Sequence, residues 1–156
     1  NPKLIIADEP TPGMNLELAK KSMKDFRKFA DEGNGVLLIT HDIELALHVA
    51  DRIVVFYAGK TVEEAPVSDF DSEETLRHPY TKALWRALPQ NGFVPLAGVQ
   101  PYVKDMPEGC PFGPRCGWYQ EHCREEIPMV QAGCGSVRCV RYCTGEKNKF
   151  QEEAKS

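Results

Sequence analysis

The stretch LIIADEP, residues 4–10, runs from four apolar residues into two carboxylates and a proline. A short apolar run of this kind is typical of a strand that is covered on both faces, as in parallel sheets. A carboxylate at the end of a buried strand is costly to desolvate unless a cation or hydrogen-bond donors meet it. Asp8 and Glu9 therefore mark a candidate binding site at the carboxyl end of the first predicted strand.

The next fifty residues alternate between helical and strand patterns. Apolar residues recur at helical spacing over 16–32, VLLIT at 36–40 predicts a second buried strand, and IVVFYA at 53–58 predicts a third. A short helix between the last two has Asp42 as its expected N-cap. The succession of strand, helix, strand, helix and strand predicts an α/β fold with a parallel sheet.

His41 follows the second predicted strand as Asp8 and Glu9 follow the first. Ligands of parallel α/β sheets bind beyond the carboxyl ends of the strands, so we expect these three residues to form one site. In phosphoryl-transfer sites, an Asp at a strand end helps to hold Mg²⁺. Glu9 points elsewhere because strand side chains alternate, and it could polarise an attacking water. His41 could donate a hydrogen bond to a terminal phosphate.

The remainder of the chain is less regular. Residues 67–88 predict two short helices separated by His78-Pro79, and residues 89–109, rich in Pro and Gly, predict an irregular linker. From Cys110 onward there is little helix or strand pattern. The composition, 42% hydrophobic and 27% charged with a net charge of −4, is ordinary for a soluble globular protein and argues against a nucleic-acid-binding surface.

All six cysteines lie between Cys110 and Cys143. This asymmetry favours a local metal or redox module over a chain stapled throughout by disulfides. Five, six and fifteen residues separate Cys110, Cys116, Cys123 and Cys139, and these gaps match neither common zinc ribbons nor ferredoxins. Cys134 or Cys143 could take the place of Cys139.

Several stretches together resemble one family. LIIADEP resembles the Walker B segment of an ATP-binding-cassette (ABC) ATPase, LLITHD at 37–42 its switch-histidine segment, and residues 50–67 the strand pair that follows. RHPYTKALWRALP at 77–89 and GCPFGPRC at 109–116 resemble the C-terminal extension of ATPase subunits from peptide and nickel importers.

The resemblance implies three regions. Residues 1–66 would be the C-terminal half of a P-loop ATPase domain, with parallel strands and helices. Residues 67–109 would be a helical extension and linker, and residues 110–156 a small irregular Cys-rich module.

The resemblance also implies roles for individual residues. Asp8 would hold Mg²⁺ of Mg-ATP through water, Glu9 would act as general base, and His41 would contact the γ-phosphate. Asn15 stands where the family has the Asp of the D-loop, which contacts the partner ATPase across the dimer. Asn keeps an acceptor oxygen but loses the charge, so one side of an asymmetric heterodimer is an alternative to a homodimer.

The implied cofactors are ATP and Mg²⁺, with a [4Fe–4S] cluster on Cys110, Cys116, Cys123 and Cys139. Zn²⁺ is an alternative for the cysteine module, as are disulfides or free thiols. In each version we expect a structural role, because a segment with so little apolar sequence needs a cross-link to fold.

The phosphate-binding loop G-x-x-x-x-G-K-[ST] does not occur in this sequence. In the family it precedes Walker B, so we expect the chain to be the C-terminal part of a longer protein. Without that loop's backbone donors and Lys, we expect these 156 residues alone to bind ATP poorly and to hydrolyse it negligibly.

The predicted function is that of an ATPase subunit powering import of peptides or related small solutes such as nickel. Its implied partners are a second ATPase subunit, two membrane permeases and a solute-binding protein, at the cytoplasmic face of the membrane. The alternatives are a non-enzymatic metal-binding or redox module, which the cysteines favour, and a soluble ABC ATPase without a transport role.

Overall fold

The computed structural model describes residues 2–143. The chain divides between Asp51 and Arg52 into two units. The domain boundaries expected after residues 66 and 109 remain predictions, and the last thirteen residues of the expected 110–156 module lie outside the described part.

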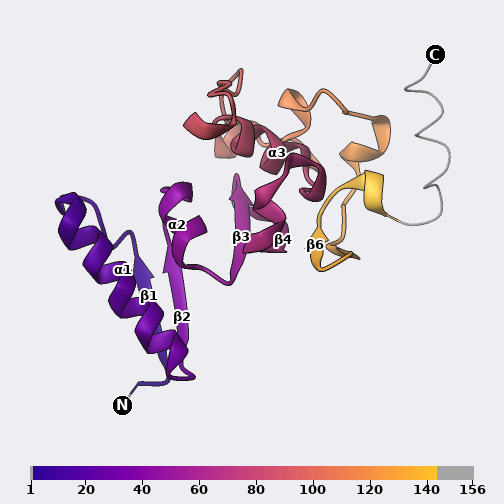
Figure 1. The fold of residues 1–156 in the computed structure, drawn as a ribbon. Coiled ribbons are helices and arrows are strands. Elements are labelled where there is room, and N and C mark those ends of the chain that lie inside the picture. Colours follow the sequence, from indigo (N-terminus) through magenta and orange to yellow (C-terminus); the bar gives the residue numbers. More distant parts are fainter. Residues whose placement is uncertain (1, 144–156) are drawn as a thin grey trace. The chain divides into compact units, whose positions relative to one another are not determined.

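The first unit is a βαβ arrangement completed by a short helix. Strand β1 (Leu4–Asp8) pairs in parallel with β2 (Gly35–Ile39), and α1 (Leu16–Asp31) connects them. Helix α2 (Ile43–Val49) follows β2. Figure 1 shows α1 lying alongside the two strands. These elements confirm the order that the hydrophobic pattern predicts, because each has its own local signal.

Side-chain caps fix where the two helices begin. The Asn15 side chain accepts a hydrogen bond from the Leu18 N–H at 2.9 Å, and Asp42 does the same for the Leu45 N–H at 3.0 Å. Each cap satisfies a backbone donor that has no partner within its helix. The N-cap predicted at Asp42 is thus confirmed.

The prediction that these strands are buried on both faces is wrong within the described residues. Ala7 is buried in the unit, as is Met23 on the inner face of α1. Side chains on the opposite face of the two strands are exposed: Leu4, Ile6, Leu37 and Ile39. A parallel sheet needs a covering layer on each face, and α1 supplies only one.

The third predicted strand does not extend the parallel sheet. Strand β3 (Arg52–Tyr57) pairs antiparallel with β4 (Lys60–Pro66). Ala58 and Gly59, the two residues of the turn, have positive φ angles of 47° and 79°. Two such residues form the tight turn that suits the twist of a β-hairpin. Within residues 2–143 the parallel sheet therefore has two strands.

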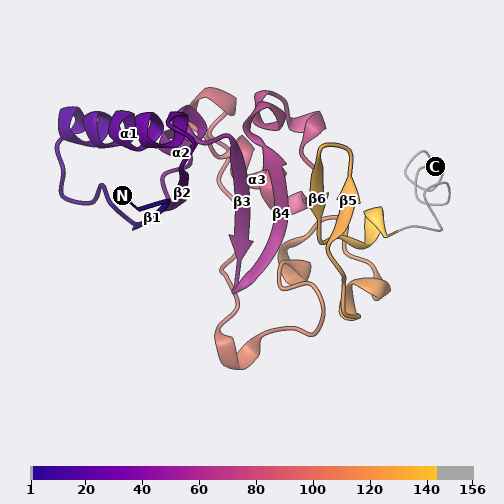
Figure 2. The ribbon, with the colours of Figure 1, turned by 90° about the horizontal axis from the view of Figure 1, so that it is seen from below.

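Figure 2 shows a second hairpin beside β4. Strands β5 (Val130–Ala132) and β6 (Gly135–Val137) complete an antiparallel sheet in the order β3-β4-β6-β5. Little strand structure was expected after Cys110, and within the described residues this hairpin is all the strand structure that the chain forms there. Each strand has three residues, which is too short for an alternating apolar and polar pattern to be recognised in the sequence. Strand β6 pairs with β4 at Glu63 and Glu64.

Between residues 52 and 143, the second unit has a single α-helix, α3 (Pro79–Arg86). Of the two helices predicted over 67–88, only the one after His78-Pro79 is α-helical. The remaining helical turns are 3-10 turns at Val67–Asp71, Glu73–Thr75, Pro89–Asn91, Val103–Asp105, Gly113–Arg115, Glu121–Arg124 and Val140–Tyr142. The segment 89–109 is otherwise irregular, as predicted.

A buried carboxylate joins the sheet of this unit to the start of α3. Glu63 on β4 is fully buried and accepts hydrogen bonds from the backbone N–H groups of Arg77 (2.9 Å) and His78 (2.7 Å). The Arg77 guanidinium also contacts Glu63, pairs with Asp69 at 2.7 Å and donates to the Ala132 carbonyl at 2.6 Å. A buried charge persists when it is paired and hydrogen-bonded in this way.

Candidate functional site

The parallel register brings Glu9 and His41 together. Asp8 is opposite Ile39 at the ends of β1 and β2, and the Glu9 N–H donates to the Ile39 carbonyl at 2.8 Å. The backbone turns sharply there, because Glu9 has a positive φ of 43°. One carboxylate oxygen of Glu9, Oε1, then accepts from the His41 backbone N–H at 3.0 Å and lies 2.9 Å from His41 Nδ1.

The electrostatics of the pair favour a cationic imidazole. The hydrogen bond to Glu9 and the charge of its carboxylate raise the pKa of His41. The His41 side chain is 82% exposed, so its Nε2 is accessible from outside the pair. Since Nδ1 is turned to Glu9, a protonated ring presents Nε2–H as a donor. That donor suits an anionic ligand.

The second carboxylate oxygen of Glu9, Oε2, has no hydrogen-bond partner in the described residues. This oxygen is buried. A buried polar atom without a partner is costly. Oε2 is therefore an unsatisfied acceptor at the end of β1.

Asp8 and Asn15 stand near this pair in sequence with different local roles. Asp8 is exposed at the end of β1. Asn15 uses its side-chain oxygen to cap α1. The metal contact expected for Asp8 and the dimer contact expected for Asn15 both remain predictions.

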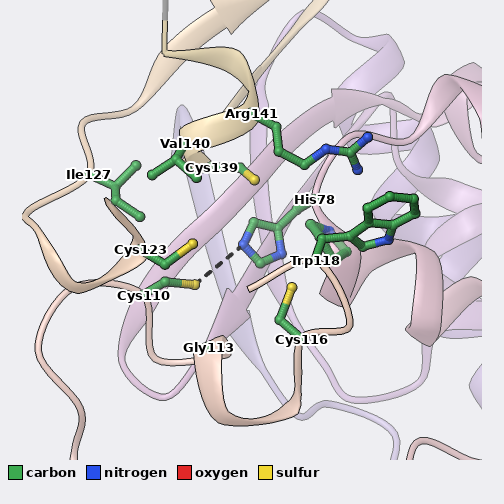
Figure 3. Close-up of a pocket in the computed structure, with 11 residues that line it drawn as sticks. His78, Cys110, Gly113, Cys116, Trp118, Cys123, Ile127, Cys139, Val140 and Arg141 are labelled. Atoms are coloured by element: carbon green, nitrogen blue, oxygen red, sulfur yellow. Dashed lines mark hydrogen bonds between the residues drawn. The ribbon is translucent and has the colours of Figure 1, made fainter. Parts of the chain in front are cut away.

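In the second unit, four of the six cysteines line one pocket. They are Cys110, Cys116, Cys123 and Cys139. Figure 3 shows their sulfur atoms turned toward a common space beside His78. These four are the residues that the sequence analysis nominated as metal ligands.

Their approach depends on one glycine. Gly109 has a φ of +71°, and a Cβ at this position would lie 2.2 Å from the Cys123 carbonyl oxygen. The Cys110 N–H donates to that same carbonyl at 2.9 Å. Because only glycine fits here, the segments that carry Cys110 and Cys123 can lie in direct contact.

The other two cysteines lie away from the pocket. Cys134 is exposed, and its carbonyl accepts from the Arg52 guanidinium at 3.3 Å. The Cys143 thiol donates to the Cys139 carbonyl at 3.6 Å. All six cysteines fall within the described residues, and all are free thiols.

Burial opposes the loss of a proton from three of the pocket thiols. It raises the pKa of Cys110 and of Cys116, and it raises that of Cys139 to about 12. A cysteine binds metal as a thiolate, so a metal here would have to displace these protons. Across residues 2–143, no three His, Cys, Asp or Glu side chains gather closely enough to hold a metal ion.

His78 is the residue of this pocket that the sequence analysis did not select. His78-Pro79 was expected to separate two helices, and His78 is the N-cap of α3. Its ring also lines the cysteine pocket, and burial lowers its pKa to about 4. No local signal could have revealed this, because His78 and Cys110 are 32 residues apart.

Known proteins match this chain both over its C-terminal region and over most of its length. Residues 62–123 match the family model described as oligopeptide/dipeptide transporter, C-terminal region. The chain is 39% identical over 145 residues to the dipeptide transport ATP-binding protein DppD of Haemophilus influenzae, covering 88% of this chain and 43% of that protein. It is 38% identical over 135 residues to DppD of Escherichia coli, covering 83% of this chain and 41% of that protein.

A parallel βαβ unit with a Glu–His pair at its strand ends, together with these matches, places the chain among ABC-type ATP-binding proteins. Within that class, the relatives it is similar to are named as dipeptide transport ATP-binding proteins, and its residues 62–123 match the transporter C-terminal region. The chain spans less than half the length of these curated relatives. In the described part of the chain, no helix combines the length and apolar character that a membrane crossing requires.

Proposed function

We propose that the chain is the C-terminal portion of an ATP-hydrolysing subunit that powers import of peptides or related small solutes such as nickel. The contact between Glu9 and His41 at the adjoining ends of β1 and β2 carries this proposal. The relatives named as dipeptide transport ATP-binding proteins support the substrate class.

In this function Glu9 is the general base. Its Oε1 is engaged by His41, while Oε2 has no partner among residues 2–143 and could accept a hydrogen bond from the attacking water. The water oxygen would attack the γ-phosphorus as its proton passes toward Glu9 and ADP leaves. His41, whose pKa is raised by the hydrogen bond to Glu9, would in its protonated form donate from Nε2 to the γ-phosphate. Asp8 would hold Mg²⁺ through a water, and the Mg²⁺ ion would neutralise charge on the phosphates.

The proposed partners follow from the family. A second ATPase subunit would face the segment around Asn15, where an amide replaces the expected carboxylate, in a homodimer or heterodimer. Two membrane permeases and a solute-binding protein would complete the importer. The subunit would lie at the cytoplasmic face of the membrane, held there by the permeases.

We further propose that the cysteine pocket holds a [4Fe–4S] cluster on Cys110, Cys116, Cys123 and Cys139, with Zn²⁺ as the alternative. Four partly or fully buried thiols that line one pocket support this ligand set, as does the place of Cys134 and Cys143 away from it. A single Zn²⁺ needs four ligands about 2.0–2.3 Å from one point, and a four-iron cluster lets its ligands stand further apart. The group would supply metal–sulfur bonds that cross-link residues 110–123 to residue 139.

The test of the ATPase proposal is hydrolysis by the complete subunit and its Glu9→Gln variant. We expect the variant to lose at least about 100-fold in kcat, as when a general base is removed, while ATP binding persists. Glu17→Gln is the matched control, because Glu17 is exposed on α1. Unchanged hydrolysis in Glu9→Gln would contradict the proposal. We expect negligible hydrolysis by residues 1–156 alone, and a Mg-ATPase rate there that Glu9→Gln abolishes would overturn this expectation.

A further inference from the structure

The ring of His78 has a defined tautomer. His78 is 1% exposed, and its Nδ1 accepts a hydrogen bond from the Tyr80 backbone N–H at 3.1 Å. A nitrogen that accepts carries no proton. The single ring proton of neutral His78 is therefore on Nε2.

That second nitrogen faces the cysteine pocket. His78 Nε2 lies 3.9 Å from Cys110 Sγ, the contact drawn as a dashed line in Figure 3. This is a long contact, within reach of an N–H donor to sulfur. Among the residues that line the pocket, Arg141 is turned to the Trp118 ring, 4.4 Å from its centroid.

The ring cannot easily turn away from this contact. The His78 backbone N–H is bound to the fully buried carboxylate of Glu63 at 2.7 Å. Pro79 follows directly and restricts the backbone of His78. The Phe112 ring packs beside the imidazole, with 6.0 Å between ring centroids. Three elements therefore hold Nε2 in place: β4, the start of α3 and the segment after Cys110.

We propose that His78 is a positioning residue of the cysteine site, donating a hydrogen bond from Nε2–H to the sulfur of Cys110. This inference rests on the proposed metal–sulfur group in that pocket. A hydrogen bond to a ligand sulfur stabilises negative charge on it, which raises the reduction potential of an iron–sulfur group. It also orients the ligand. The hydrogen bond also links the start of α3 to the metal site.

Two variants separate the ring's two nitrogens. In His78→Asn, the amide oxygen can replace Nδ1 as the cap of the Tyr80 N–H, but the side chain is too short to place a donor near Cys110. In His78→Gln, the longer side chain can place an amide N–H near the position of Nε2. Both variants remove the imidazole and introduce an amide, and they differ in which of the two ring nitrogens that amide can replace.

The first measurement uses the whole chain, purified anaerobically and reconstituted with ferrous iron and sulfide. Iron and sulfide content and the visible spectrum report whether a cluster binds. We expect a lower midpoint potential in His78→Asn than in the wild type, with His78→Gln restored toward the wild-type value. Equal potentials in all three proteins, or equal cluster loss in both variants, would overturn the proposal, since His78 would then act through packing alone.

A second measurement does not depend on a cluster. Long-range ¹H–¹⁵N spectra of the histidine rings report the tautomer, and His78→Asn identifies the His78 signals by their loss. We expect an Nε2–H tautomer whose ring resonances shift in Cys110→Ala. A protonated Nδ1, or no response to Cys110→Ala, would overturn the hydrogen bond. Absence of iron together with the expected ring signals would instead reject the cluster and retain the contact.

Discussion

One oxygen of Glu9 binds both the backbone N–H and the ring nitrogen Nδ1 of His41, at 3.0 and 2.9 Å. The two residues are 32 positions apart and meet because β1 and β2 run parallel and end at the same edge. The contact orients the imidazole and leaves Nε2 directed away from Glu9. The acid and the histidine therefore form one functional pair.

The titration of His41 is expected to depend on Glu9. The folded pKa of His41 is raised above its usual value of 6.5 by the hydrogen bond and charge of Glu9. The pair therefore contributes stability at pH values below 6.5, and this contribution is lost as the pH rises through the folded pKa. Because the His41 side chain is largely exposed, the effect on unfolding is small, and ring titration by NMR is the better measurement.

Glu9→Gln should lower the pKa of His41, since the amide keeps an acceptor but loses the charge. His48 provides an internal control, because its ring contacts the Glu44 carbonyl instead. If the His41 titration were the same in the wild type and in Glu9→Gln, the two side chains would not interact in solution.

The first unit shows what a sequence can predict. Strands β1 and β2 and helices α1 and α2 have continuous apolar runs, helical periodicity and capping residues of their own. The pairing of β3 was missed because a strand's sequence does not name its neighbour. The resemblance of residues 50–67 to a strand pair did imply β3 and β4 together, but not the direction of their pairing.

Some residues of the two sites could be predicted from the sequence, and others could not. Glu9 and His41 could be selected because each follows an apolar strand, and parallel strands end at one edge. The four cysteines could be nominated by type and family resemblance. The contacts of Glu63 and His78 could not be predicted, because they join β4, the start of α3 and the segment after Gly109. Only the tertiary fold brings those together.

The buried carboxylate of Glu63 should be essential to the second unit. Glu63→Ala removes the acceptor of two backbone N–H groups and leaves the Arg77 guanidinium with less compensation in a buried place. We expect a loss of about 3 kcal/mol or more in unfolding free energy, as when one partner of a buried pair is removed. Urea unfolding followed by circular dichroism measures this.

Glu64→Ala is the matched control one residue away. Glu64 pairs with Arg52 at 2.9 Å, and both side chains are more than one-third exposed. An exposed pair contributes about 1 kcal/mol or less. Equal losses in Glu63→Ala and Glu64→Ala would contradict the role assigned to burial.

Metal binding should distinguish the four pocket cysteines from the other two. Single Cys→Ser changes at Cys110, Cys116, Cys123 or Cys139 should lower iron content after anaerobic purification. Cys134→Ser and Cys143→Ser should retain it, because these residues do not line the pocket. An absorption band at about 400 nm in the wild type identifies an iron–sulfur cluster, whereas a colourless wild-type protein that contains zinc would favour the alternative. Iron loss in Cys134→Ser equal to that in Cys139→Ser would contradict the ligand set.

Gly109 should be required for the cysteine pocket to close. In Gly109→Ala, the new Cβ would stand 2.2 Å from the Cys123 carbonyl oxygen, at a φ of +71° that side chains disfavour. We expect a loss of at least about 2 kcal/mol in unfolding free energy, from left-handed strain and the displaced backbone. Metal content should fall with it, because Cys110 and Cys123 would move apart. Gly117→Ala is the control, since nothing lies within 4 Å of its added Cβ, and such a change is neutral or slightly stabilising. If Gly109→Ala kept both its stability and its metal, the close contact between these two segments would not be what holds the pocket together.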